Sequence, residues 1–224
     1  EGVLPLSQHI GEPATPIVEK GARVVRGQKI ADGGATGVPI HASITGKLKP
    51  IDRRPHPTLV SAESMAIKTT GEVEELEFPE DPDWRVLSKE EAIDRIREAG
   101  IVGLGGAAFP TWRKLSLPPG IKVDTLIING AECEPYLTSD YRTLLAHPLE
   151  VMQGALAMAH LIGVPRLLFG LEADKADAVE PLRAAAREAA RDEIQVDVIT
   201  CQVRYPQGAE RQLVTALTGR VIPA

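Results

Sequence analysis

Residues 101–114 read Ile-Val-Gly-Leu-Gly-Gly-Ala-Ala-Phe-Pro-Thr-Trp-Arg-Lys and combine clustered glycines with a basic pair. Gly103, Gly105 and Gly106 fall within four residues, and Lys114 closes the run. Glycine adopts backbone angles that other residues avoid, and it lets a ligand approach the peptide N–H groups closely. A row of N–H groups beside a lysine suits a phosphate or a flat anionic cofactor.

The glycines follow a predicted helix, whereas in the usual dinucleotide fingerprint they follow a strand and open a helix. Ser88 and Glu91 match a capping box, and Gly100 is expected to end the helix. The next predicted strand comes only at residues 125–129. The glycines alone therefore leave open a tight helix-to-strand connection that binds no ligand.

The composition is that of a globular protein, with 224 residues, 43% hydrophobic and 25% charged. The net charge of −6 and the lack of a basic block argue against nucleic-acid binding. No apolar run approaches the length of a membrane span, so we expect no direct membrane insertion and any membrane role through partner subunits. Cys133 and Cys201 are too few for an iron–sulfur cluster, which normally takes four cysteines. The histidines lack the tight spacing of a metal site.

Residues 1–75 are predicted to form a small β-rich domain, because short apolar pieces alternate with Lys-Gly and Arg-Gly turns. This rhythm resembles the barrel-sandwich hybrid domains of the biotinyl/lipoyl type. No Met-Lys pair stands at a predicted hairpin, so we expect no modified lysine. Residues 76–87 are acidic and contain prolines, which favours an exposed linker, with an acidic docking surface as the alternative.

Residues 88–224 alternate strands with helices, which predicts an α/β domain with a Rossmann-like, mostly parallel sheet and flanking helices. The expected elements after residue 100 are a strand at 125–129, a helix at 148–162, a strand at 166–169, a helix within 175–191, a strand at 194–200 and a helix at 210–217. Ligands of such sheets bind at the carboxyl ends of the strands.

Two polar segments follow strands of this sheet. Residues 129–136, Asn-Gly-Ala-Glu-Cys-Glu-Pro-Tyr, come after the first strand, and residues 205–210, Tyr-Pro-Gln-Gly-Ala-Glu, come after the last. We expect both to meet the glycine run at that edge. The alternative is that Asn129 caps a turn and that Glu132 and Glu134 are solvated.

Taken together and in this order, the three motifs resemble the flavin/NADH-binding family of complex I flavoprotein subunits. Within that family they are most similar to the C subunits of Rnf electron-transport complexes. Residues 5–11 and 39–43 also resemble the N-terminal barrel-sandwich region of those subunits, so the resemblance covers nearly the whole chain.

The resemblance implies non-covalent FMN and NAD(H), with no catalytic side chain because hydride transfer belongs to the flavin. The residues that it assigns to cofactor binding are Gly103, Gly105, Gly106, Ala107, Phe109, Lys114, Asn129, Glu132, Glu134, Tyr205, Gly208 and Glu210. Phe109 would stack near the dinucleotide, Lys114 would meet phosphate, and Asn129 would bond the flavin. Carboxylates repel phosphate, so the three glutamates would accept bonds from ribose hydroxyls or amides.

The implied function is hydride exchange between NADH/NAD⁺ and FMN, with single electrons passed to [4Fe-4S] clusters outside these residues. The implied setting is a ferredoxin:NAD⁺ oxidoreductase of the Rnf type that is coupled to ion transport. Its implied partners are the membrane and ferredoxin-like Rnf subunits and ferredoxin. The implied location is peripheral, on the cytoplasmic face of the bacterial inner membrane.

The chain departs from the family pattern at Ala108, where the family usually has glycine, and at Ala209, where it often has glycine or glutamate. The family also continues past Ala224, with a loop for the FMN phosphate, a β domain and a two-cluster ferredoxin domain. We therefore expect the 224 residues to be a fragment that binds flavin weakly or not at all.

Three alternatives are a docking module that has lost flavin binding, a related cobalamin reductase, and an ordinary nicotinamide dehydrogenase. The cobalamin reductases would lack the N-terminal domain, and the helix-before-glycine order disfavours an ordinary dehydrogenase.

Overall fold

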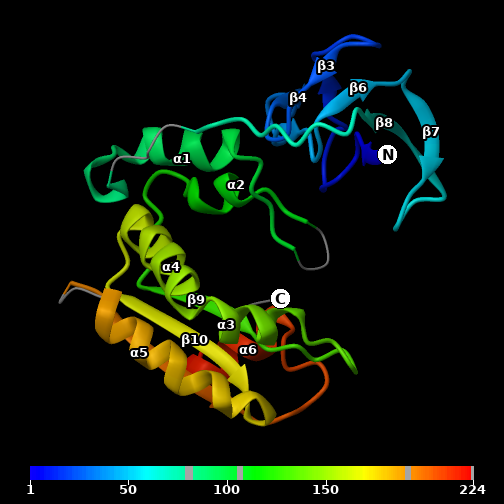
Figure 1. The fold of residues 1–224 in the computed structure, drawn as a ribbon. Helices are drawn as coiled ribbons and strands as arrows, with labels where there is room; N and C mark the ends of the chain where they lie inside the picture. Colours follow the sequence, from blue (N-terminus) through cyan, green and yellow to red (C-terminus); the bar gives the residue numbers. More distant parts are fainter. Residues whose placement is uncertain (79–82, 105–107, 190–192, 223–224) are drawn as a thin grey trace. The chain divides into compact units, whose positions relative to one another are not determined.

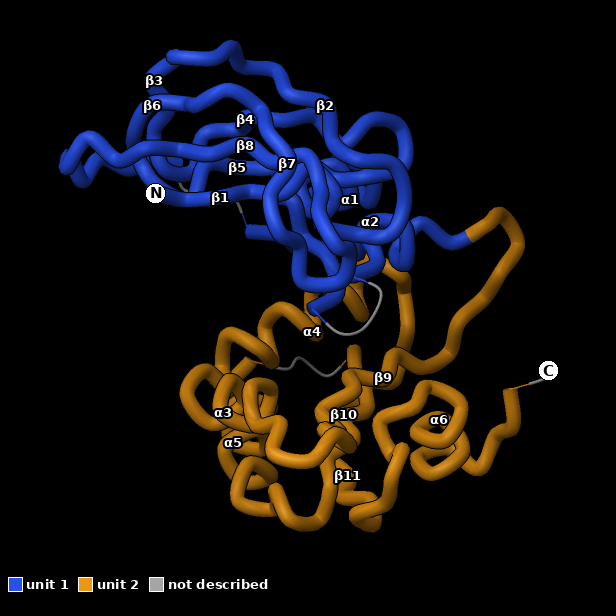
Figure 2. Tube along the Cα trace, turned by 90° about the vertical axis from the view of Figure 1, so that its right-hand side faces the viewer, with its two compact units in different colours: residues 1–117 blue, residues 118–224 orange. Residues whose placement is uncertain are grey.

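The computed structural model describes residues 1–78, 83–104, 108–189 and 193–222 (Figure 1). Its contacts divide the chain into two compact units, residues 1–117 and residues 118–224 (Figure 2). The predicted division into a domain at 1–75, a linker at 76–87 and a domain at 88–224 stays a prediction. Among the described helices, none combines the length and the hydropathy needed to cross a bilayer.

The first unit begins with a small barrel of short strands, as the sequence predicted. These strands are β1 (Gly2–Pro5), β2 (Thr15–Pro16), β3 (Arg23–Val24), β4 (Lys29–Asp32), β5 (Ile40–His41), β6 (Gly46–Leu48), β7 (Asp52–Pro55) and β8 (Ser61–Thr69). One sheet has the order β1-β8-β6-β3 with β7 also on β8, and a second has the order β2-β4-β5. Val24, Ile30 and Ile67 are completely buried between them.

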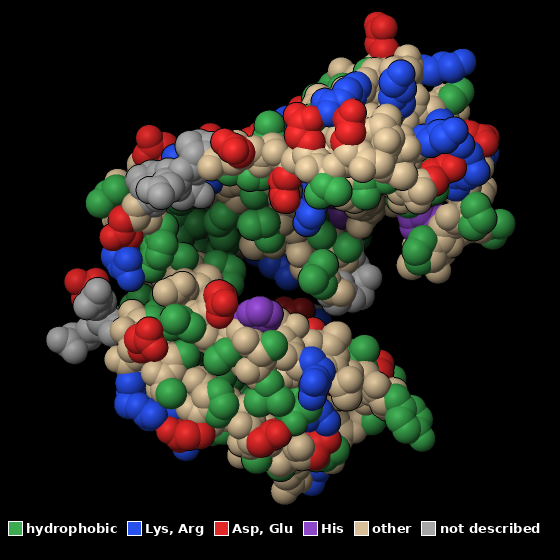
Figure 3. Space-filling view, viewed as in Figure 1, with side chains coloured by type: hydrophobic (Ala, Val, Ile, Leu, Met, Phe, Trp, Pro, Cys, Tyr) green, Lys and Arg blue, Asp and Glu red, His purple; other side chains and the backbone are tan. Residues whose placement is uncertain are grey.

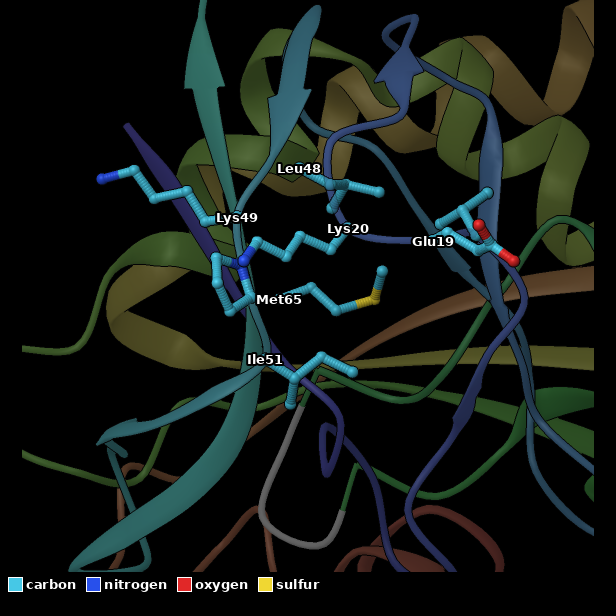
Figure 4. Close-up of a pocket in the computed structure, with 8 residues that line it drawn as sticks. Glu19, Lys20, Leu48, Lys49, Ile51 and Met65 are labelled. Carbon is cyan, nitrogen blue, oxygen red and sulfur yellow. The ribbon is translucent and has the colours of Figure 1, made fainter.

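Charged side chains of both signs are scattered over the face of the barrel seen in Figure 3, and exposed pairs on the barrel include Arg23 with Glu72 at 2.7 Å. Such pairs add little stability in water. A pocket on the barrel has Leu48 and Met65 in its wall and Lys20 beside them (Figure 4). Because Leu48 and Met65 belong to the barrel core, this pocket marks where that core reaches the surface.

The acidic stretch after β8 runs along the barrel rather than away from it. The Arg23 guanidinium binds the carboxylates of Glu72 and Glu74. The Leu76 N–H donates to the Arg26 carbonyl oxygen at 2.8 Å, and the Phe78 ring lies against Gly27. The first residues of the predicted linker are therefore held on the barrel surface.

The first unit ends with η1 (Trp84–Val86), α1 (Lys89–Glu98) and α2 (Thr111–Leu115). The predicted capping box is confirmed, because the Ser88 hydroxyl accepts the Glu91 N–H at 3.3 Å and the Glu91 carboxylate accepts the Ser88 N–H at 2.9 Å. The Ser88 hydroxyl also donates to the Glu91 carboxylate at 2.7 Å, and this bond, together with the one from the Ser88 N–H, lowers the pKa of Glu91. Gly100 follows the helix with φ +74°, the left-handed conformation that ends many helices.

The second unit is an α/β domain with the predicted parallel sheet. Its elements are β9 (Thr125–Gly130), α3 (Ser139–Ala146), α4 (Pro148–Ile162), β10 (Arg166–Glu172), η2 (Ala173–Ala178), α5 (Val179–Ala189), β11 (Gln195–Cys201) and α6 (Glu210–Thr218). The strand order is β11-β10-β9, and both pairings are parallel. Two features differ from the sequence prediction: β10 extends to Glu172, and helix α3 lies where no element was predicted.

Strand β10 is buried on both faces. Helices α4 and α5 cover one face and α6 covers the other (Figure 1). On the α6 face, the ends of Leu213 and Leu217 come within 3.0 Å of where a Cβ on Gly170 would lie. Leu168 is completely buried in the same cluster. A nearly continuous apolar strand is what a central parallel position requires.

We predict that Leu168→Ala lowers the free energy of unfolding of the second unit by about 2–5 kcal/mol, because it leaves a cavity between β10 and α6. Leu137→Ala is the matched control, because Leu137 is 43% exposed. Thermal or urea unfolding followed by circular dichroism measures both, and equal effects of the two substitutions would contradict the assignment.

Candidate functional site

The described residues at the two ends of the glycine run, 101–103 and 109–111, pair as the base of a hairpin between α1 and α2. The Gly103 N–H donates to the Phe109 carbonyl oxygen at 2.9 Å, and the Thr111 N–H donates to the Ile101 oxygen at 3.1 Å. The two ends of the run are therefore hydrogen-bonded to each other, and they connect helix α1 to helix α2. This differs from the tight helix-to-strand connection considered from the sequence. Three predicted site residues lie outside the described residues: Gly105, Gly106 and Ala107.

Two cations lie beside the aromatic ring of this hairpin. The Arg113 guanidinium is 5.5 Å and the Lys114 ammonium 5.9 Å from the centre of the Phe109 ring. The Lys114 nitrogen is also 3.7 Å from where a Cβ on Gly103 would lie, so a side chain there would fill the space beneath the ammonium. Since the Gly103 N–H already closes the hairpin, the group that suits an anion here is the ammonium of Lys114.

The two alanines that depart from the resembled family differ in conformation. Ala108 has φ +46°, which costs an L residue about 1–2 kcal/mol and explains why glycine suits this position. Ala209 has φ −63° and precedes α6 as its N-cap residue, so its backbone carries no such strain. The departure at Ala108 thus places an alanine at a positive φ, whereas the departure at Ala209 adds only a methyl group.

At the carboxyl edge of the sheet, the loops after β9 and β11 are in direct contact. The Asn129 side-chain N–H donates to the Gly208 carbonyl oxygen at 2.8 Å, and its oxygen accepts the Ala131 N–H at 3.1 Å. A Cβ on Gly208 would lie 2.5 Å from the Ala131 oxygen. This confirms that the two loops meet and that Asn129 caps a turn, while its bond to flavin stays a prediction.

Glu132 is buried, with 6% of its surface exposed, and serves the start of α3. Its carboxylate accepts the N–H groups of Asp140 at 2.7 Å and Tyr141 at 3.2 Å. A negative charge is favourable at this positive end of a helix. The alternative in which Glu132 is solvated is therefore wrong, whereas Glu134 is exposed. No local sequence pattern reveals that Glu132 caps α3, because a whole loop separates Glu132 from the start of that helix.

Sequence analysis missed Glu172, the last residue of β10. Only 2% of its surface is exposed. Burial raises its pKa, as does the charge of Asp174, while Lys175 and the N–H groups of Arg204 and Glu132 oppose the rise. Its carboxylate thus contacts the loop after β9 and the loop after β11. The available signal was a glutamate ending the apolar run 166–172, and the predicted strand stopped before it.

The remaining predicted residues lie at the same edge. Tyr205 is exposed and joined to Pro206 by a cis peptide bond. Glu210 is exposed in the first turn of α6. The Lys175 ammonium lies 5.5 Å from the centre of the Tyr141 ring and pairs with the Asp174 carboxylate at 2.6 Å. The edge therefore offers exposed carboxylates and the phenol of Tyr205 to a polar ligand.

Two family models match this chain. Residues 1–72 match the RnfC barrel sandwich hybrid domain, and residues 96–224, more than half of the chain, match the Nuo51 FMN-binding domain. The chain belongs to the Nuo51 FMN-binding domain family. The hairpin from Gly103 onward and the whole sheet edge lie inside the Nuo51 FMN-binding region.

The curated relatives that match this chain are C subunits of redox complexes. The chain is 41% identical over 223 residues to the C subunit of the proton-translocating ferredoxin:NAD(+) oxidoreductase complex of Clostridium ljungdahlii, covering 99% of this chain and 48% of that protein. It is 39% identical to the C subunit of the Na(+)-translocating complex of Acetobacterium woodii, covering 99% of this chain and 50% of that protein. The chain spans about half the length of these two relatives.

Among solved structures, this chain is similar to an NAD+-reducing [NiFe]-hydrogenase in the air-oxidized state. The TM-score is 0.55 at 25% identity, over 59% of this chain and 24% of the hydrogenase chain. The H2-reduced structure gives a TM-score of 0.55 at 23% identity, over 62% and 26% of the two chains, which supports the fold alone. The predicted fold class is confirmed.

We predict that Gly208→Ala lowers the free energy of unfolding by about 1–3 kcal/mol, because a methyl group would collide with the Ala131 backbone. Gly154→Ala is the matched control. Gly154 is exposed within α4 with nothing near a built Cβ, so alanine there should raise stability by about 0.5–1 kcal/mol. Urea unfolding measures both, and a stabilising Gly208→Ala would contradict the loop contact.

We predict a pH signature for Glu172. Its pKa in the folded chain lies above the ordinary 4.5, so the folded state holds this proton more tightly than the unfolded state does. The contribution of Glu172 to stability is therefore greatest below pH 4.5 and is lost as the pH rises through the raised pKa.

Glu172→Gln should abolish this part of the pH dependence of unfolding, measured by urea titrations across the acid range. The exposed Glu134→Gln serves as the control. A pH profile of Glu172→Gln that runs parallel to that of the parent chain would rule out the assignment.

Proposed function

We propose that this chain forms the FMN- and NAD(H)-binding part of a ferredoxin:NAD⁺ oxidoreductase of the Rnf type. The observation that carries the proposal is that the cation-flanked hairpin and the polar sheet edge both fall inside the region that matches the FMN-binding family. The names of the curated relatives support the same reaction class. FMN, when bound, supplies the exchange between hydride and single electrons.

The residues of the hairpin fit a phosphate-bearing cofactor. Lys114 and Arg113 provide positive charge where Gly103 leaves room, and Phe109 provides a flat apolar surface. We propose that Gly105, Gly106 and Ala107 complete this surface, as the family resemblance implies.

The residues of the sheet edge fit hydroxyl and amide groups. Both oxygens of Glu132 are occupied by the start of α3, so it shapes the loop. The exposed Glu134, Tyr205 and Glu210 are the better acceptors for ribose hydroxyls. Asn129 acts with Gly208 by holding the two loops together.

We propose that the chain works with other subunits of an ion-translocating complex and with ferredoxin, at the cytoplasmic face of the membrane. Electrons would pass to [4Fe-4S] clusters in parts of the protein beyond the matched region. The match of residues 1–72 to the RnfC barrel disfavours a cobalamin reductase.

A docking module without flavin is the second candidate. The strained Ala108, at a position where the family usually has glycine, is the observation that favours it.

We predict that FMN, titrated with flavin fluorescence as the readout, binds more tightly to a chain as long as the curated relatives than to residues 1–224. In the longer chain, Lys114→Gln should weaken binding by about 10- to 150-fold, since a charge-assisted bond contributes about 1.5–3 kcal/mol. The exposed Lys122→Gln should have no effect. Ala108→Gly should not weaken binding.

Two outcomes would decide against parts of this proposal. If neither chain binds FMN, the docking module becomes the better interpretation. If residues 1–224 bind FMN stoichiometrically and tightly, the expectation of weak binding by the shorter chain is wrong.

A further inference from the structure

The loop between β4 and β5 of the barrel contacts the helices that flank the glycine hairpin. The Trp112 indole N–H donates to the Gly37 carbonyl oxygen at 3.1 Å. The Arg97 guanidinium donates to the Gly34 carbonyl oxygen. Residues of both α1 and α2 are thus hydrogen-bonded to one barrel loop.

The end of α1 lies directly against the same loop. A Cβ on Gly100 would lie 3.0 Å from the Pro39 oxygen and 3.3 Å from a ring nitrogen of His41. Nearby, the Lys29 ammonium of β4 pairs with the Glu98 carboxylate at 2.8 Å. The chain just after α1 therefore passes so close to the barrel that a side chain at Gly100 would force the barrel residues to shift.

The barrel loop is itself held in one shape. The Gly37 N–H donates to the Gly33 oxygen at 3.0 Å, and the Val38 N–H donates to a ring nitrogen of His9 at 3.3 Å. Gly33 and Gly37 are both buried, and a Cβ on either would collide with backbone atoms at 2.3 and 2.5 Å. This loop is a fixed platform rather than an adaptable contact.

The helices on the platform have little support of their own. Helix α2 has five residues, which is too short to be stable alone. In α1, all of whose residues are described, none is fully buried. The Arg97 guanidinium lies 5.1 Å from the centre of the Trp112 ring and so links the two helices. Leu115 of α2 is buried, so apolar packing of that residue and the polar contacts with the barrel together place the two helices.

Trp112 connects the platform to the base of the hairpin. Its neighbour Thr111 closes the hairpin through the Ile101 oxygen, and Lys114 follows one half-turn later in α2. Holding Trp112 therefore fixes the start of α2, and with it the position of Lys114 over Gly103.

We propose that the β4–β5 loop, residues 33–39, is a clamp that positions the glycine hairpin, with Trp112 and Arg97 as its positioning residues. The barrel thereby acts as a scaffold for the hairpin in addition to any docking role. The contribution of the clamp to cofactor affinity rests on the proposed function, whereas its effect on the hairpin does not.

Trp112→Phe tests the clamp, because it removes the indole N–H and keeps an aromatic ring beside Arg97. Trp84→Phe is the matched control, since Trp84 also has an arginine over its ring, with Arg85 at 4.3 Å. Hydrogen exchange of residues 1–224 should show about fivefold faster exchange at the Gly103 and Thr111 amides in Trp112→Phe only.

Barrel amides show whether the fold survives. The Ala42 N–H, bonded to the Gln28 oxygen at 2.8 Å, should exchange equally in both variants. Unchanged exchange at Gly103 and Thr111 in Trp112→Phe would overturn the proposal. So would equal acceleration in Trp84→Phe.

A fluorescence measurement tests Arg97 independently. The chain has two tryptophans, so in Trp84→Phe the emission comes from Trp112 alone. Adding Arg97→Ala should increase acrylamide quenching of Trp112, whereas the exposed Lys89→Ala on the same helix should not. Equal quenching with and without Arg97 would remove that residue from the clamp.

The affinity arm uses the longer chain and FMN. Trp112→Phe should weaken FMN binding several-fold and Trp84→Phe should not. If the parent chain binds no FMN, the proposed function fails while hydrogen exchange still decides the clamp. If FMN affinity is unchanged in Trp112→Phe, the clamp does not position the binding residues.

Discussion

Burial of β10 on both faces is the constraint on which the second unit depends. A central parallel strand needs helices on each side, and its polar carboxyl end must find partners where the helices stop. Glu172 finds them in the N–H groups of Arg204 and Glu132. The loops after β9 and β11 therefore both lie at the end of β10, and the hydrogen bond between Asn129 and Gly208 joins them.

The first unit is organised differently, because the described residues of its glycine hairpin belong to no sheet. The hairpin closes on itself through Gly103 and Phe109, and its flanking helices are attached to barrel carbonyls. Backbone groups serve as the attachment points in both units, which allows close approach at Gly100 and at Gly208. Glycine is required there for space, and at Gly100 for its positive φ as well.

The sequence predicted what is encoded locally. The capping box at Ser88, the terminal glycine Gly100 and the apolar strands all follow from neighbouring residues, and the structure confirms them. The prediction failed where the hydrogen-bonding partner of a residue is distant in the chain. Helix α3 is capped by Glu132, which lies a loop away in the sequence. The partners of the Glu172 carboxylate likewise come from two other loops. The family resemblance assigned the site residues, and the structure adds that Asn129 and Glu132 already have backbone partners.

The attachment of α1 and α2 to the barrel also bears on how such a protein can be divided. A boundary near residue 87 would follow the change in composition, yet it would separate Trp112 and Arg97 from the carbonyl groups that hold them. A boundary after Leu117 keeps each hydrogen-bonded set intact. The piece that can be transferred or recombined as a unit is thus the barrel together with the hairpin, although family resemblance assigns the hairpin to the domain that follows it.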